Sequence, residues 1–262
     1  MKKNINGLSV YCVGDSTKPS LVFLHGFPFD ATLWNAQIEA LSDDYYCVAY
    51  DIRGLGNSSV ENTPFTMESF IDDLEEVMEV LALQKPIVCG FSMGGYIALR
   101  AVERFESKFS ALILCDTISH ADSNEGKLKR AAAIKAINTK GLAPFVEGFV
   151  DICFGKEFKE HSQDVLVQLK AQMKQCNPLG VKASLVAMAA RTDTTENLSK
   201  ITLPTLVCCG EDDAITPLEV VKKMAQSIHG AHFVSIPKSG HVAPMENPEA
   251  LNRAIKAFLV SF

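Results

Sequence analysis

Short apolar runs alternate with amphipathic helical patterns along most of this chain of 262 residues, and this order limits the fold more than any other feature. The apolar runs have the length of strands and lie at residues 21–24, 46–50, 87–89, 111–115, 206–209 and 233–236. Helical patterns lie between or after them, near residues 32–42, 70–81, 93–105, 218–228 and 248–260. Strands that alternate with helices in this way build a largely parallel sheet with helices on both faces. The sequence therefore predicts an α/β fold.

The first residues do not follow this alternation. Asn6-Gly7 lies between residues 3–5 and 8–13, and this dipeptide favours the positive-φ turn of a two-residue β-hairpin. The hairpin begins the sheet with antiparallel strands. Together with the later apolar runs, it predicts an eight-stranded, mostly parallel sheet.

Residues 118–199 break the alternation a second time. They keep a helical periodicity but contain no convincing strand, and Gly141, Gly155 and Pro178 interrupt the helices. We interpret this segment as a helical cap inserted over the sheet. The predicted domain organisation is a core of residues 1–117 and 200–262 and a cap of residues 118–199.

Charge and hydropathy exclude several classes of function. The net charge is -6 and the lysines and arginines are scattered, so the chain lacks the basic surface that nucleic acids or anionic membranes require. No apolar stretch approaches the roughly 20 residues of a membrane-spanning helix, and the first residues lack the apolar run of a signal peptide. We expect a cytoplasmic protein that acts on a small molecule and binds neither nucleic acid nor membrane.

The eight cysteines are expected to be free thiols. A disulfide framework is the alternative, but a chain of this length does not need such cross-links. No C-x-x-C pair occurs, and the adjacent Cys208 and Cys209 would point to opposite faces of a strand, so no metal site is expected. Cysteine in an apolar strand-like run behaves as a small buried hydrophobic residue, and this applies to Cys47, Cys89, Cys115, Cys208 and Cys209.

The segment Gly90-Phe91-Ser92-Met93-Gly94 carries the strongest chemical signal. It follows a predicted strand and precedes a predicted helix. A strand-to-helix turn this sharp forces the serine into a strained backbone conformation, and it leaves no room for side chains at Gly90 and Gly94. We therefore predict that Ser92 projects above the sheet as a nucleophile. A glycine-rich turn without chemical meaning is the alternative, which partner residues must exclude.

His241 is the best candidate for the base among six histidines. A serine hydroxyl needs a base within hydrogen-bond reach. His241 lies between the last strand and the last helix, and loops at the carboxyl ends of parallel strands are where α/β sheets place active sites. His25 is expected to fix its own loop. The other histidines are expected to be exposed or to lie in or beside the cap: His229, His232, His120 and His161.

Asp213 is the favoured acid that orients the histidine. It follows the seventh predicted strand, and the chain order Ser92, Asp213, His241 is one of the orders in which Ser-His-Asp triads occur. Three rival carboxylates remain: Glu211 and Asp212, whose alternative is to be solvated neighbours, and Asp116, which ends the sixth strand. Acyl transfer places negative charge on the carbonyl oxygen, and backbone N–H donors must stabilise this oxyanion. The expected donors are the N–H of Met93, which follows the nucleophile, and the N–H of Phe27, in the loop after the third strand.

Five motifs in order give the chain an end-to-end resemblance to the α/β-hydrolase superfamily. They are Leu24-His25-Gly26-Phe27-Pro28, Asp51-Ile52-Arg53-Gly54-Leu55-Gly56-Asn57-Ser58, the turn at Ser92, the segment from Gly210 to Pro217, and Ser239-Gly240-His241. Within the superfamily, residues 114–117 and 189–193 are most similar to those of 3-oxoadipate enol-lactonases and related small esterases. The resemblance implies an α/β-hydrolase fold with an eight-stranded, mostly parallel sheet, helices on both faces and a helical cap insertion.

These residues and the resemblance together predict a serine hydrolase. It would cleave a small carboxylic ester or lactone through an acyl-enzyme intermediate, without a cofactor. The alternatives are 3-oxoadipate enol-lactonase activity in particular, a cofactor-free haloperoxidase or carbon-carbon hydrolase on the same triad, or a non-catalytic binding protein.

Four residues near the cap are candidates for substrate binding. Phe145, Phe149 and Met188 would either roof an apolar pocket or form the core of the cap. Arg191 would either bind a substrate carboxylate or be a solvated surface arginine.

Overall fold

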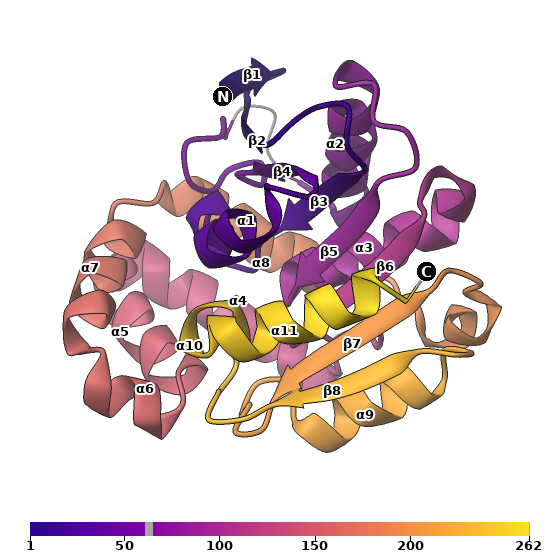
Figure 1. Cartoon of the computed structure of the whole chain (residues 1–262). Coiled ribbons are helices and arrows are strands. Elements are labelled where there is room, and N and C mark those ends of the chain that lie inside the picture. The colour runs from indigo at the N-terminus through magenta and orange to yellow at the C-terminus, as the bar shows by residue number, and fades with distance from the viewer. Residues whose placement is uncertain (61–64, 262) are drawn as a thin grey trace.

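An eight-stranded sheet forms the centre of the molecule (Figure 1), in a computed structural model that describes residues 1–60 and 65–261. The strand order is β1-β2-β4-β3-β5-β6-β7-β8. Only the pairings of β2 with β1 and with β4 are antiparallel, and the remaining pairings are parallel. The strands are β1 Lys2–Ile5, β2 Leu8–Val13, β3 Ser20–Leu24, β4 Tyr46–Tyr50, β5 Ile87–Phe91, β6 Ala111–Cys115, β7 Thr205–Gly210 and β8 His232–Ile236. This confirms the predicted number of strands and the antiparallel hairpin at Asn6-Gly7.

The central strands β4, β5, β6 and β7 are buried along their whole length. A parallel strand that is covered on both faces reads as a continuous apolar run rather than as an alternation, which is the pattern that identified these segments. The edge strands are different, because β1 is largely exposed and β8 is only partly buried.

Helices cover both faces of the sheet, as predicted (Figure 1). Helices α1 and α11 contact each other on one face, and α2 and α3 contact each other on the other. Within the described part of the chain, none of the helices combines the length and the apolar composition needed to span a bilayer. The bounds are α1 Asn35–Leu41, α2 Met67–Val80, α3 Met93–Phe105, α9 Leu218–Gln226, α10 Ala243–Glu246 and α11 Pro248–Leu259, with short 3-10 helices at Ala31–Trp34, Glu106–Lys108 and Thr195–Lys200.

The helix α2 shows why these segments are helical. Thr66 caps its first turn, and the side chains of Thr66 and Ser69 form a reciprocal capping box. The predicted apolar stripe then buries Phe70, Leu74 and Val77.

Five further helices lie between β6 and β7, at one side of the sheet (Figure 1). They are α4 Asn124–Lys140, α5 Leu142–Cys153, α6 Lys156–His161, α7 Gln163–Lys174 and α8 Pro178–Ala189, and we call them the inserted helices. The predicted breakers mark their ends: Gly141 lies between α4 and α5, Gly155 precedes α6, and Pro178 begins α8. The division into a core of residues 1–117 and 200–262 and a cap of residues 118–199 stays a prediction.

All eight cysteines are free thiols, as expected. Seven of them are buried, and only Cys176 is half-buried. They therefore pack as small apolar side chains in the sheet and its surroundings.

Candidate functional site

Ser92 occupies the sharp turn between β5 and α3. Its backbone has a φ of 51°, a left-handed conformation that is rare for a residue with a side chain. A Cβ atom at Gly90 would lie 2.4 Å from the carbonyl oxygen of Gly94, and one at Gly94 would lie 2.2 Å from that of Leu24. Gly90 therefore allows β5 to contact the start of α3, and Gly94 allows α3 to pack on the end of β3; both contacts hold the serine in its strained position.

His241 lies on the loop between β8 and α10, and its side chain is buried. Its Nε2 atom is 3.0 Å from Oγ of Ser92, and its Nδ1 atom is 2.8 Å from Oδ2 of Asp213. The ring of Phe91 packs beside the imidazole, with 5.2 Å between the ring centroids. The structure thus brings together Ser92, His241 and Asp213, which are far apart in the sequence.

Asp213 accepts hydrogen bonds from several donors in addition to His241. Oδ1 accepts from the backbone N–H groups of Ile215 at 2.7 Å and Thr216 at 2.8 Å, and Oδ2 accepts from the Thr216 hydroxyl at 2.5 Å. Burial alone would raise the pKa of Asp213, but His241 and Thr216 outweigh burial and hold this pKa below its ordinary value. The carboxyl group is therefore ionised and held in one orientation.

Asp116, the main rival for the role of the acid, is fully buried at the end of β6. Its Oδ1 atom accepts from the backbone N–H of Gly210 at 2.7 Å, whereas Oδ2 has no hydrogen-bond partner among the described residues. Burial raises the pKa of Asp116 well above its ordinary value, and the nearby Asp213 carboxylate raises it further. A neutral carboxyl group is the form that this environment favours. Glu211 and Asp212, the two residues that precede Asp213 in the sequence, are exposed.

Asp116, Cys209 and Asp213 place their possible ligand atoms within 4.8 Å of one another. Burial raises the pKa of the Cys209 thiol, and a neutral thiol is a poor metal ligand. Both oxygens of Asp213 already accept the hydrogen bonds described above. These properties do not favour coordination of a metal ion by the three residues.

The remaining histidines lie outside this chain of hydrogen bonds. His25 is fully buried, its Nδ1 atom is 2.8 Å from the carbonyl oxygen of Gly26, and its Nε2 atom accepts from the N–H of Ile52. These bonds fix the loop after β3, as the sequence predicts. The other four are exposed: His120, His161, His229 and His232.

The two predicted oxyanion donors belong to segments that approach Ser92. Met93 is the first residue of α3, so its N–H belongs to the first turn of the helix, where no intrahelical acceptor is available. The loop that carries Phe27 also approaches Ser92, because a Cβ atom at Gly26 would lie 3.0 Å from Cβ of Ser92. Both elements therefore approach Ser92, and the role of the Phe27 and Met93 amides as oxyanion donors stays a prediction.

The inserted helices contribute aromatic rings above this loop. Phe145 and Phe149 stack on each other, and both make edge contacts with the Phe27 ring, at centroid distances of 5.9 and 6.0 Å. Phe145 and Phe149 are both partly buried. Met188 is buried, and its sulfur accepts a hydrogen bond from the Arg130 guanidinium at 3.4 Å. The two phenylalanines therefore pack on the loop that carries Phe27, and Met188 packs below the surface. A role of these residues in substrate binding stays a prediction.

Arg191 is buried, so the expectation of a solvated surface arginine is wrong. Its Nη1 atom donates to Asp122 at 2.6 Å and to the carbonyl of Met188 at 3.0 Å, and Nη2 donates to the carbonyl of His120. The guanidinium also stacks over the ring of Tyr96 at 4.2 Å. Asp122, which also pairs with Arg130, and two backbone carbonyl groups occupy both terminal nitrogens of this buried guanidinium, so these contacts do not favour the predicted binding of a substrate carboxylate.

Two residues at the site were not identified from the sequence. Thr216 supports Asp213, and its hydroxyl lies 3.3 Å from Nδ1 of His241. Glu246 is half-buried beside the His241 loop and accepts three backbone hydrogen bonds there. The position of Thr216 three residues after Asp213 was the available signal, because an aspartate often accepts hydrogen bonds from the residues that follow it in a turn.

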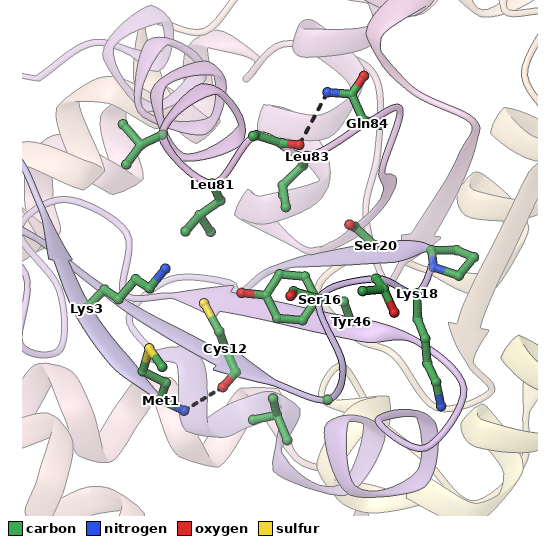
Figure 2. Close-up of a pocket in the computed structure, with 16 residues that line it drawn as sticks. Met1, Lys3, Cys12, Ser16, Lys18, Ser20, Tyr46, Leu81, Leu83 and Gln84 are labelled. Carbon is green, nitrogen blue, oxygen red and sulfur yellow. Dashed lines mark hydrogen bonds between the residues drawn. The ribbon is translucent and has the colours of Figure 1, made fainter.

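A cavity of about 970 Å³ opens at the opposite end of the sheet (Figure 2). It lies near the amino ends of β3 and β4 and beside the end of α2, with Lys3, Cys12, Tyr46 and Leu81 in its lining. Ser92 and its partners lie at the carboxyl ends of the strands, which is where ligands bind in α/β sheets. The cavity is therefore separate from the candidate active site.

Comparison with known proteins supports the fold along the whole chain. The family model for the alpha/beta hydrolase fold matches residues 19–248. The 3-oxoadipate enol-lactonase 1 of Acinetobacter baylyi is 30% identical over 255 residues, which are 97% of this chain and 93% of that protein. The bifunctional esterase/perhydrolase of Acinetobacter calcoaceticus is 27% identical over 260 residues, which are 95% and 94%.

Among solved structures, a thermophilic esterase from Thermogutta terrifontis has a TM-score of 0.94 to this chain at 32% identity, and the match covers 99% of this chain and 98% of that one. The family model alone spans most of the sheet and the loops that carry Ser92, Asp213 and His241. The chain therefore belongs to the α/β-hydrolase family.

Proposed function

We propose that this protein is a serine hydrolase that cleaves a small carboxylic ester or lactone. The observation that carries the proposal is the continuous chain of hydrogen bonds from Ser92 through His241 to Asp213, at 3.0 and 2.8 Å. Nucleophile, base and orienting acid in this arrangement are the requirements for acyl transfer by an activated serine.

In the first half of the reaction, Ser92 Oγ attacks the substrate carbonyl carbon while its proton moves to Nε2 of His241. Asp213 accepts the hydrogen bond from Nδ1 and stabilises the imidazolium. The ester C–O bond then breaks, and His241 gives its proton to the departing oxygen, which leaves an acyl-enzyme. In a lactone, this alcohol remains attached to the acyl group.

In the second half, His241 takes a proton from water, and the resulting hydroxide attacks the acyl carbon. The bond to Ser92 breaks, and the serine recovers the proton from His241. In both halves the carbonyl oxygen carries negative charge in the tetrahedral intermediate. The N–H groups of Phe27 and Met93 are the donors that we assign to this oxyanion.

Phe145 and Phe149 provide an apolar surface next to Phe27, which suits the acyl part of an ester. Relatives named as an enol-lactonase and as an esterase support esters and lactones as the substrate class. The similarity to an enzyme named as an esterase/perhydrolase favours perhydrolysis as a second candidate function. In that reaction hydrogen peroxide replaces water in the attack on the acyl-enzyme, so a peroxyacid forms instead of a carboxylic acid.

Covalent labelling and a substrate panel test the proposal. A fluorophosphonate should label Ser92 in the wild type, since only an activated serine reacts at a useful rate. Ser92→Ala should lose both the label and the hydrolysis of small p-nitrophenyl esters and aliphatic lactones. The control is Ser227→Ala, which changes an exposed serine and should keep both. Labelling that persists in Ser92→Ala would contradict the proposal.

A further inference from the structure

Glu246, the last residue of α10, accepts hydrogen bonds from three backbone N–H groups. Oε1 accepts from Val242 at 2.8 Å, and Oε2 accepts from Gly240 at 3.0 Å and from Gly155 at 2.7 Å. Each of these contacts requires an acceptor, and a carboxylate offers only acceptors. Burial raises the pKa of Glu246 above its ordinary value, and the three N–H donors oppose this shift without cancelling it.

The three donors come from two parts of the molecule. Gly240 and Val242 are the residues on either side of His241, whereas Gly155 lies between α5 and α6 of the inserted helices. The N–H of His241 itself donates to the carbonyl oxygen of Cys153 at 2.8 Å, and Cys153 is the last residue of α5. The backbone of the histidine loop is thus bonded to the α5–α6 junction both directly and through Glu246.

The two backbones also approach each other too closely for side chains. A Cβ atom at Gly240 would lie 2.5 Å from the backbone nitrogen of Gly155. A Cβ atom at Gly155 would lie 3.0 Å from Oε2 of Glu246 and from the nitrogen of Gly240. A change at either glycine must therefore move the junction, the histidine loop or the carboxylate.

We propose that Glu246 is a positioning residue that couples the α5–α6 junction of the inserted helices to the orientation of His241. The carboxylate keeps the residues on both sides of the histidine in register with the junction, and this holds Nε2 of His241 against Ser92. Movement of the inserted helices, which border the substrate site through Phe145 and Phe149, is then transmitted to the base. This inference rests on the proposed function, because it assigns Glu246 a role in the same reaction.

Replacement of the carboxylate tests the positioning role. Glu246→Gln turns one acceptor into an N–H donor that faces backbone N–H groups, so the loop must shift. We expect kcat and the rate of fluorophosphonate labelling to fall on the order of tenfold to a hundredfold, with KM changed little, because a small misplacement of a reacting group has effects of this size. Glu249→Gln is the control, since Glu249 is exposed at the start of α11 and should leave both rates unchanged.

A second pair of variants approaches the link from the side of the inserted helices. Gly155 has a φ of -64°, which alanine adopts easily, so Gly155→Ala perturbs only the close contact with Glu246 and Gly240. Gly148→Ala in α5 is the control, because its Cβ would meet nothing within 4 Å. We expect Gly155→Ala to lower kcat and Gly148→Ala not to. The effects of Gly155→Ala and Glu246→Gln should not add in the double variant if both act through one link.

Hydrogen exchange separates this inference from the proposed function. In Glu246→Gln the amides of Gly155, Gly240 and Val242 should exchange faster than in the wild type, while amides in the centre of the sheet keep their protection. A wild type that is folded but hydrolyses no ester or lactone would refute the proposed function and leave the exchange result to test the link. The inference would be overturned if Glu246→Gln and Gly155→Ala matched their control variants in both kinetics and hydrogen exchange.

Discussion

Asp213 and Asp116 are two buried carboxyl groups at the same end of the sheet, and their surroundings drive them to opposite protonation states. Asp213 accepts hydrogen bonds from His241 and Thr216, which lower its pKa despite burial. Asp116 receives one backbone N–H, and burial raises its pKa. Two such groups with divergent environments commonly take different roles in a site. Here Asp213 is the ionised group and contacts the base His241, whereas Asp116 is the neutral group and accepts from the backbone of Gly210.

This contrast predicts different costs for the same substitution. Asp213→Asn should lower kcat on the order of 10⁴-fold, because the asparagine no longer holds the reactive tautomer of His241 or stabilises its charged form. Asp116→Asn should stay within about threefold of the wild type, since the amide resembles the neutral carboxyl group in shape. Steady-state kinetics on a small p-nitrophenyl ester measures both. A crippled Asp116→Asn beside a mildly affected Asp213→Asn would show that the acid has been misassigned.

Asp116→Asn also carries a prediction about stability. A carboxyl group whose pKa is raised on folding binds more protons in the folded state than in the unfolded chain. Its contribution is therefore fully present below the unfolded pKa of about 4 and is lost as the pH rises toward the folded pKa. Asp116→Asn should increase the free energy of unfolding at pH 7 relative to the wild type, and this gain should shrink toward pH 4. Urea unfolding at several pH values checks this, and an equal effect at all pH values would contradict it.

At the scale of secondary-structure elements, the sequence predicted the parts whose cause is local. The turn at Ser92 could be recognised because the steric need for Gly90 and Gly94 arises within five residues. The buried strands could be recognised because continuous apolar runs suit parallel strands that are covered on both faces. The hairpin at Asn6-Gly7 likewise follows from the conformational preference of two residues.

The elements whose surroundings come from distant residues could be predicted only in part. The helix α4 buries only Ile137, so it has no wide apolar stripe to mark its bounds. Arg191 is paired with Asp122, which lies 69 positions earlier, and Glu246 accepts from Gly155, 91 positions earlier. Neither pairing leaves a local pattern in the sequence. For this reason the burial of Arg191 was missed and Glu246 was not singled out.

At the scale of the whole molecule, we propose that the sheet supplies the reacting groups and that the inserted helices restrict what reaches them. Ser92, Asp213 and His241 all lie on loops that follow strands of the sheet. Phe149, from α5, contacts both Phe27 and Phe29 of the loop after β3, at centroid distances of 6.0 and 6.2 Å. We propose that these packed rings border the acyl side of the site and leave limited room for a long acyl chain.

This arrangement predicts a maximum in the dependence of activity on acyl chain length. Each acyl methylene that is buried contributes roughly 0.8 kcal/mol, or about fourfold, so kcat/KM on p-nitrophenyl esters should rise from acetate toward butyrate. Longer chains should then lose activity, because they must displace packed rings or remain in water without gain.

Phe149→Ala should move the maximum toward longer chains by removing one of these rings. Phe105→Ala, near the opposite end of α3, is the control and should leave the maximum in place. If the activity of the wild type instead keeps rising up to palmitate esters at a lipid interface, the prediction is wrong. That result would indicate that the inserted helices open as a mobile lid and that the packed rings do not limit the acyl chain length.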